Sequence, residues 1–164
     1  MEALDIFSSR ISVREYSDRS ISKEDLMKIA DAGRLAATAR NEQPWEFVVV
    51  TDRKKVAELA GLTDTGKFMA GAGASIAVFC RDTKYYIEDG SAATENMLLA
   101  AAALGISSCW IAGDKKDHAV RISAALGAPA GMKLVSLISL GYPRAKPQPH
   151  EKRPLKELVH WEKF

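Results

Sequence analysis

The order of strand-like and helix-like segments predicts an α/β fold with a parallel sheet. Short β-branched and aromatic runs, such as residues 47–50, alternate with longer segments whose apolar residues recur every three or four positions. This alternation is typical of strand–helix–strand units, in which helices join parallel strands. The chain has 164 residues, about the length of one domain, so a single domain is expected over residues 1–164.

Helix caps and helix breakers delimit the elements expected in the first half of the chain. A short amphipathic helix is expected at 3–9. The next helix, at 22–37, opens on a serine whose hydroxyl can cap its first turn. Pro44 forbids helix, and the apolar run behind it predicts a strand at 46–51. A helix then follows at 52–61, with aspartate as its cap and glycine at its end.

The second half continues the alternation up to a proline-rich tail. A strand is expected at 75–80, and an alanine-rich helix at 87–104, closed by the next glycine. A strand at 106–112, a helix at 115–126 and a strand at 134–140 complete the set. The four expected strands therefore alternate with helices along the chain.

Two stretches of the second half need separate interpretation. Residues 96–113 carry no formal charge and approach the length of a membrane span, but Gly105 divides them into an alanine-rich half and a β-like half. They are interpreted as a buried helix followed by a buried strand, with no membrane partner. Residues 141–154 contain four prolines and predict an extended arm. The apolar side chains among residues 155–164 predict that this arm docks on a partner subunit.

Composition and charge exclude several classes of protein. The chain is 47% hydrophobic and 27% charged, which is typical of a globular protein. Its 23 basic and 21 acidic residues leave a net charge of +2, so no nucleic-acid partner is expected. Two cysteines are too few for a disulfide framework, and the first residues do not resemble a signal peptide. A cytoplasmic location is the expectation.

The sequence motifs of common catalytic and metal sites are absent. The three histidines share no ligand spacing with one another or with the cysteines, so no metal site is expected. Neither G-x-S-x-G nor G-x-x-x-x-G-K-[ST] occurs, which argues against a serine hydrolase and a P-loop. No catalytic side chain is therefore assigned.

Two sets of alternating polar residues remain. Arg10, Ser12 and Arg14 point the same way in an extended segment, and two guanidinium groups beside a hydroxyl suit a phosphate monoester. A solvated basic edge is the alternative. Asn41 and Gln43 carry carboxamides that can read the edge of a planar heterocycle. The alternative interpretation is that Asn41 only stabilises a turn and that Gln43 is an ordinary surface residue.

Four sequence blocks follow one another in the order of a known family. They are Arg-x-Ser-x-Arg-x-Tyr at 10–16, Asn-x-Gln-Pro-Trp at 41–45, the alanine-rich block with Gly-x-x-x-Cys-Trp-Ile at 96–111, and Leu-Gly-Tyr-Pro with a later Arg-Pro-Leu from 140 onward. On these blocks the chain resembles the nitroreductase family of flavin enzymes. The blocks span nearly the whole sequence.

The resemblance implies a different fold from the one that the alternation predicts. The implied fold is α+β, with a mixed sheet surrounded by helices. It further implies FMN bound at the interface of a homodimer, and a C-terminal arm that crosses to the partner subunit. This expectation replaces the parallel sheet.

The resemblance also implies which positions contact FMN. Arg10, Ser12 and Arg14 match contacts to the phosphate and ribityl chain, and Asn41 and Gln43 match contacts to the flavin ring and ribityl chain. The full set of implied contacts is Arg10, Ile11, Ser12, Arg14, Asn41, Gln43, Trp110, Ile111, Ala112, Gly113, Lys152 and Arg153.

The remaining implied contacts lie late in the chain. Residues 110–113 match the segment along the flavin, where a backbone N–H approaches N5. Ala112 stands where the family often has an acidic residue or glycine, so only its backbone can take part. From the C-terminal arm, Lys152 or Arg153 matches the basic residue at the phosphate, and His150 remains a third possibility.

The function implied is that of an FMN-dependent oxidoreductase. NADH or NADPH would donate electrons, and a small-molecule acceptor such as a nitroaromatic or a quinone would take them in a ping-pong cycle. Because FMN carries the chemistry, the missing catalytic motifs agree with this function. The alternatives are a specialised reaction on the same fold (dehalogenation or flavin fragmentation), a non-catalytic flavin carrier or sensor, and a structural α/β domain.

Overall fold

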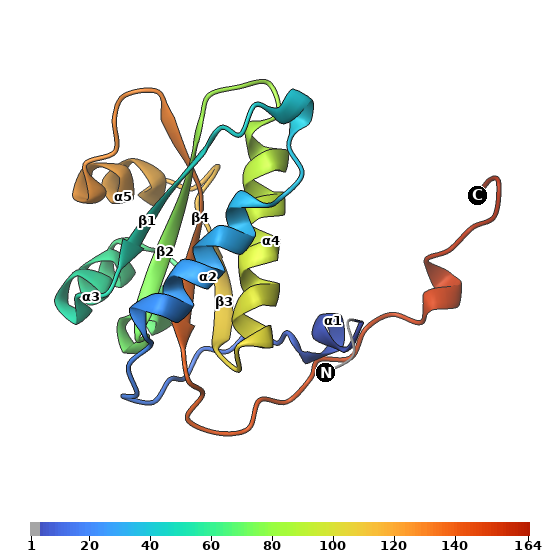
Figure 1. Cartoon of the computed structure of the whole chain (residues 1–164), viewed down its shortest axis with the longest axis horizontal. Coiled ribbons are helices and arrows are strands. Elements are labelled where there is room, and N and C mark those ends of the chain that lie inside the picture. Colours follow the sequence, from blue (N-terminus) through green and yellow to red (C-terminus); the bar gives the residue numbers. More distant parts are fainter. Residues whose placement is uncertain (1–3) are drawn as a thin grey trace.

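A four-stranded antiparallel sheet forms the centre of the protein. The computed structural model describes residues 4–164 (Figure 1). The strands are β1 (Trp45–Val50), β2 (Ala74–Arg81), β3 (Ser107–Ala112) and β4 (Met132–Gly141), in the order β1-β2-β4-β3. All three neighbouring pairs are antiparallel. Within the described residues, parallel pairing is limited to an isolated bridge between Ser12 and Ser108.

The parallel α/β sheet that the alternation predicts is therefore wrong, and the α+β fold is confirmed, with an antiparallel sheet in place of the mixed sheet that the resemblance implies. The connection between β2 and β3 does join two strands of the same direction. However, β4 inserts between them and pairs antiparallel with both. The alternation of strands and helices along the chain does not reveal this insertion, because β4 is the last strand in the sequence but a central strand of the sheet.

Helices cover both faces of the sheet (Figure 1). On one face, α2 (Lys23–Arg34) and α4 (Tyr86–Ala103) enclose a hydrophobic core with the sheet. On the other face, α3 (Arg53–Leu62) and α5 (His118–Leu126) enclose a second core. The sheet is thus buried on both sides, and α1 (Asp5–Ser9) lies at the end of α4.

The predicted N-terminal caps of the helices agree with the structure more closely than the predicted C-terminal ends. Ser22 Oγ accepts the N–H of Asp25 at 3.0 Å, and Asp52 Oδ1 accepts the N–H of Lys54 at 3.0 Å. Two ends are wrong: α2 stops at Arg34, and α3 continues through the glycine expected to end it. Residue 3 of the helix expected at 3–9 lies outside the described residues.

Residues 96–113 form the end of α4 followed by β3, as interpreted from the sequence. Gly105 closes the helix with φ +71°, a left-handed conformation that favours glycine. None of the helices in residues 4–164 combines the length and apolar character that a membrane crossing needs.

The C-terminal residues form the expected extended arm. Figure 1 shows the chain after β4 passing below the sheet and then leading away from it, through the short helix η3 (Leu155–Glu157). Three large apolar side chains on this part of the arm are almost uncovered: Leu155 is 73% exposed, Trp161 83% and Phe164 106%. Apolar surface gathered in this way is typical of a segment that binds another surface.

Candidate functional site

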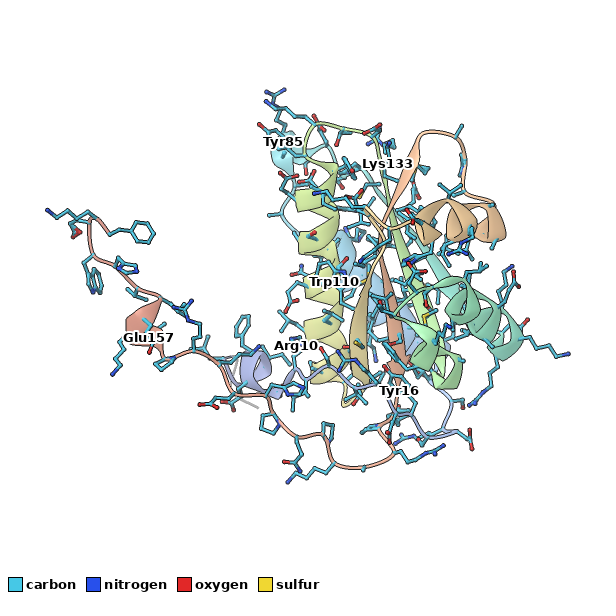
Figure 2. All side chains as sticks on the ribbon, turned by 180° about the vertical axis from the view of Figure 1, so that it is seen from behind. Arg10, Tyr16, Tyr85, Trp110, Lys133 and Glu157 are labelled. Atoms are coloured by element: carbon cyan, nitrogen blue, oxygen red, sulfur yellow. The ribbon has the colours of Figure 1, made fainter. Side chains whose placement is uncertain are left out.

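The segment after α1 runs beside the outer edge of β3. The Val13 N–H donates to the Ser108 carbonyl at 2.9 Å, next to the bridge between Ser12 and Ser108. Figure 2 shows Arg10 near the starting end of β3 and Trp110 further along the strand. The first and third sequence blocks are therefore neighbours in space.

The alternating residues Arg10, Ser12 and Arg14 act on one common neighbour, the thiol of Cys109. Burial raises the pKa of this thiol, while the Arg14 charge, a hydrogen bond from Ser12 and the Arg10 charge act in the opposite direction. The raised pKa keeps the thiol protonated, so Cys109 is not a nucleophile. The expected common direction of the three side chains holds only in part, because Arg10 lies at Glu95 of α4 whereas Arg14 lies over the Phe68 ring.

A hollow of about 260 Å³ lies between this segment and the C-terminal arm. Its lining consists of Phe7, Ser8, Arg10, Ile11, Ser12, Pro149, His150 and Lys152. Arg10 and Ser12 thus share one hollow with two of the basic residues expected at the phosphate. The third, Arg153, lies outside this lining and contacts Glu157 instead. Arg14 is also outside it, above the Phe68 ring at 5.7 Å.

The hollow is positively charged but small. The Arg10 Nε lies 3.6 Å from the Glu95 carboxylate, and the Arg10 side chain is 21% exposed, so the guanidinium is partly held in place. A second hollow of about 200 Å³ also borders Arg10 and Ile11, against the end of α4. Each volume lies below the roughly 300 Å³ at which small-molecule sites begin. One chain thus offers room for part of a cofactor such as FMN.

The outer edge of β3 presents free backbone groups. The Gly113 N–H donates to the Val135 carbonyl at 3.0 Å. This bond shows which residues of the β3 segment direct their backbone groups toward β4 and which direct them away from it. Every second residue of β3 therefore faces β4, and the N–H groups of Trp110 and Ala112 point to the outer edge. Within residues 110–113, these two backbone donors are the ones available to a ligand.

Close packing fixes the position of this segment. Ile111 is buried, so its side chain contributes to the core rather than to a binding surface. A Cβ atom on Gly113 would lie 2.6 Å from Leu134 Cγ and 2.9 Å from the Leu134 carbonyl oxygen. Because Leu134 belongs to β4, glycine at 113 allows the segment to lie directly against the sheet.

Asn41 and Gln43 lie on an exposed loop with an unusual backbone. The loop contains the short helix η1 (Ala39–Asn41). Arg40, Asn41 and Gln43 have φ values of +53°, +57° and +46°. Non-glycine residues rarely adopt this left-handed conformation, and such residues gather at functional sites. The conformation supports a binding role for this loop.

A buried carboxylate holds the loop. Asp89, in the first turns of α4, is 4% exposed and accepts hydrogen bonds from Thr38 Oγ1 at 2.8 Å and the Ala39 N–H at 2.9 Å. Nothing in the sequence distinguishes Asp89 from Glu88 and Glu95, the other acidic residues of the same helix, so its role becomes visible only in the structure.

The polar residues at 10–14 and those at 41–43 lie far apart within one chain. Figure 1 shows η1 beside the first turns of α4 and α1 at its far end. The 18 residues of α4 rise by about 27 Å at 1.5 Å per residue. Asn41 and Gln43 therefore lie far from the hollow that Arg10 and Ser12 line.

Two titratable groups near residues 110–113 have partners that the sequence does not reveal. The Tyr86 hydroxyl donates to Asp114 Oδ1 at 2.7 Å, and this hydrogen bond is the main cause that raises the pKa of Tyr86 to about 12. His118 is completely buried, with Nε2 at 2.9 Å from the Ala112 carbonyl oxygen. In residues 4–164, no group of His, Cys, Asp and Glu side chains could hold a metal ion.

Together these features define an α+β protein with a basic hollow and free backbone donors at one edge of its sheet. A family model described as "Putative TM nitroreductase" matches residues 2–164. The chain belongs to the nitroreductase family, as its sequence resemblance indicates.

Individual relatives agree with this assignment. A "Putative NADH dehydrogenase/NAD(P)H nitroreductase" from Archaeoglobus fulgidus is 41% identical over 151 residues, covering 87% of this chain and 86% of the relative. A solved structure with the same description from Bacteroides thetaiotaomicron has a TM-score of 0.94 and 31% identity, covering 100% of this chain and 99% of that one. A structure described as a "putative nitroreductase in complex with FMN" from Desulfovibrio desulfuricans has a TM-score of 0.87 and 32% identity, covering 100% of this chain and 98% of that one.

Proposed function

We propose that this protein is an FMN-dependent oxidoreductase that passes electrons from NADH or NADPH to nitroaromatic, quinone or similar acceptors. The observation that carries the proposal is the basic hollow of Arg10, Ser12 and Lys152 beside the free backbone edge of β3. The FMN complex of the Desulfovibrio desulfuricans relative supports it. The proposed FMN-binding domain spans residues 1–164.

The residues at the hollow fit the phosphate end of FMN. Two cationic side chains, Arg10 and Lys152, stand beside the Ser12 hydroxyl, and this donor set suits a phosphate monoester. Further along the edge, the Ala112 N–H can donate to an acceptor atom of the ring. The free, buried cysteines Cys80 and Cys109 fit a reducing compartment such as the cytoplasm.

We further propose that two chains form each FMN site in a homodimer. One chain keeps Asn41 and Gln43 far from the hollow at Arg10, and that hollow is smaller than a whole cofactor requires. A second chain can supply the missing loop. The apolar end of the arm, which is exposed here, would cover a surface of that partner.

The protein residues bind and orient rather than react. Bound FMN supplies the hydride and electron transfer. Arg10, Lys152 and Ser12 would neutralise and hold the phosphate, and the Ala112 N–H would donate to the ring. Donors placed in advance at a site of developing negative charge stabilise that charge. Gly113 keeps this donor close to the sheet.

The cofactor content of the purified protein tests the first proposal. We expect one FMN per subunit, released by heat and bleached by NADH or NADPH under nitrogen. Released FAD would contradict the cofactor assignment, and a colourless protein that does not take up added FMN would contradict the site. FMN that neither donor reduces would indicate a flavin carrier or sensor.

Donor and acceptor are expected to react in turn at the same face of the flavin. No common dinucleotide-binding motif occurs in the sequence, so a separate donor site is not expected. Double-reciprocal plots at several acceptor concentrations should therefore be parallel, as in a ping-pong cycle. Intersecting lines would indicate that both substrates bind together and would contradict this order.

A further inference from the structure

His118, the first residue of α5, is completely buried beside the C-terminal end of β3. Its Nε2 lies 2.9 Å from the Ala112 carbonyl oxygen. Its Nδ1 lies 3.5 Å from Asp64 Oδ2 and is among the buried polar atoms without a hydrogen-bond partner in the described residues. Asp64 in turn lies 3.6 Å from Arg121 Nη2. The imidazole therefore connects the loop that follows α3 with residues 110–113.

The chemistry of the Ala112 carbonyl determines the tautomer of His118. A carbonyl oxygen can only accept a hydrogen bond, so Nε2 must carry a proton. Nδ1 then faces the Asp64 carboxylate at 3.5 Å. The ring therefore reaches Ala112 as a donor.

The loop that carries Asp64 is anchored against β3. The Thr63 hydroxyl accepts the N–H of Gly66 at 3.0 Å. A Cβ atom on Gly66 would lie 3.0 Å from Ile111 Cγ2, so this loop packs directly on the strand. The backbone around Asp64 is therefore held beside β3.

Ala112 is the residue at which this bond matters. In an antiparallel strand, the N–H and the C=O of one residue point to the same side. The carbonyl that accepts from His118 thus belongs to the residue whose N–H faces the outer edge of β3. The carbonyl belongs to the peptide unit after Ala112 and the N–H to the unit before it, so a bond to the carbonyl limits the φ and ψ rotations of Ala112 that would turn the N–H away from the outer edge.

We propose that His118 is a positioning residue for the flavin: its Nε2–H holds the Ala112 carbonyl and thereby aims the Ala112 N–H at the ring. Asp64 lies on the other side of the imidazole, 3.5 Å from Nδ1. This inference rests on the proposed function, in which residues 110–113 lie along FMN.

Two substitutions separate the hydrogen bond from the volume of the ring. In His118→Phe the ring volume remains but the donor is lost, and we expect FMN binding to weaken about tenfold, the size of one ordinary hydrogen bond. In His118→Gln a carboxamide N–H can replace Nε2–H, and most of the affinity should return. Val120→Ala, at an exposed position of the same helix, is the control and should have no effect.

The dissociation constant of FMN and the midpoint potential of bound FMN are the readouts. A positioning role predicts that His118→Phe changes both and that His118→Gln restores both. The proposal is overturned if folded His118→Phe matches the wild type in both, or if the Gln variant is as impaired as the Phe variant. Wild-type protein that binds no FMN would instead contradict the proposed function.

A measurement on the wild type keeps the inference testable if His118→Phe does not fold. The ¹⁵N spectrum of the His118 ring in the FMN-free protein should show a protonated, hydrogen-bonded Nε2. A ring protonated at Nδ1 alone cannot donate to Ala112 and would overturn the proposal.

Discussion

Deletion of residues 147–164 should abolish both the dimer and FMN binding. The deletion removes the exposed apolar end of the arm, together with His150 and Lys152 of the basic hollow. Burying one large apolar side chain stabilises by about 1.5–3 kcal/mol, and several are available on the arm. Sedimentation velocity and the flavin absorbance of the purified protein measure the two losses.

Two full-length variants divide this prediction into its parts. Lys152→Ala removes a charge from the hollow, so it should weaken FMN binding and leave the dimer intact. Trp161→Ala removes apolar surface from the arm, so it should weaken the dimer first. A truncated monomer that still binds FMN tightly would contradict the proposed role of the arm.

Arg10→Ala should weaken FMN binding by about 1.5–3 kcal/mol, or roughly tenfold to a hundredfold, the usual size for hydrogen bonds to charged groups. The guanidinium lies in the hollow with Ser12, and its loss would leave Glu95 facing the phosphate without its partner. Isothermal titration of the FMN-free protein measures the change.

Riboflavin and a second arginine provide the controls for this variant. Riboflavin lacks the phosphate, so its affinity should change far less than that of FMN. Arg53→Ala removes an exposed arginine of α3 that pairs with Asp18, and this variant should bind FMN as the wild type does. Equal FMN affinity in Arg10→Ala and Arg53→Ala would show that Arg10 does not contact the phosphate.

Local signals in the sequence predict much of the fold. The cap residues Ser22 and Asp52 act as expected, because a cap depends on the residue and the few N–H groups that follow it. The direction of the strands depends on where β4 inserts, which is a long-range property. The family resemblance supplies the correct fold class where the alternation of elements fails.

The candidate site, too, can be predicted from the sequence only in part. The alternation of Arg10, Ser12 and Arg14 can be read from the sequence, but it does not reveal that Arg14 lies outside the hollow, above Phe68. The roles of Asp89 and His118 cannot be read in this manner. Each acts on a backbone group brought to it by folding: the Ala39 N–H for Asp89 and the Ala112 carbonyl for His118.

The central claim is that each FMN site takes Arg10 from one chain and Asn41 from the other. It can be tested with a dimer that combines an Arg10→Ala chain and an Asn41→Gly chain, isolated through two different tags. Glycine at 41 removes the carboxamide and tolerates the positive φ of this position. The two corresponding homodimers, in which every site carries a lesion, are the controls.

The decisive measurement is the number of FMN molecules that this mixed dimer binds with wild-type affinity. If the sites are shared, both lesions fall in one site and the other site is intact. We therefore expect one tightly bound FMN per mixed dimer and none in either homodimer. A mixed dimer with no site of wild-type affinity would contradict the shared site, because each chain would then carry its own damaged one.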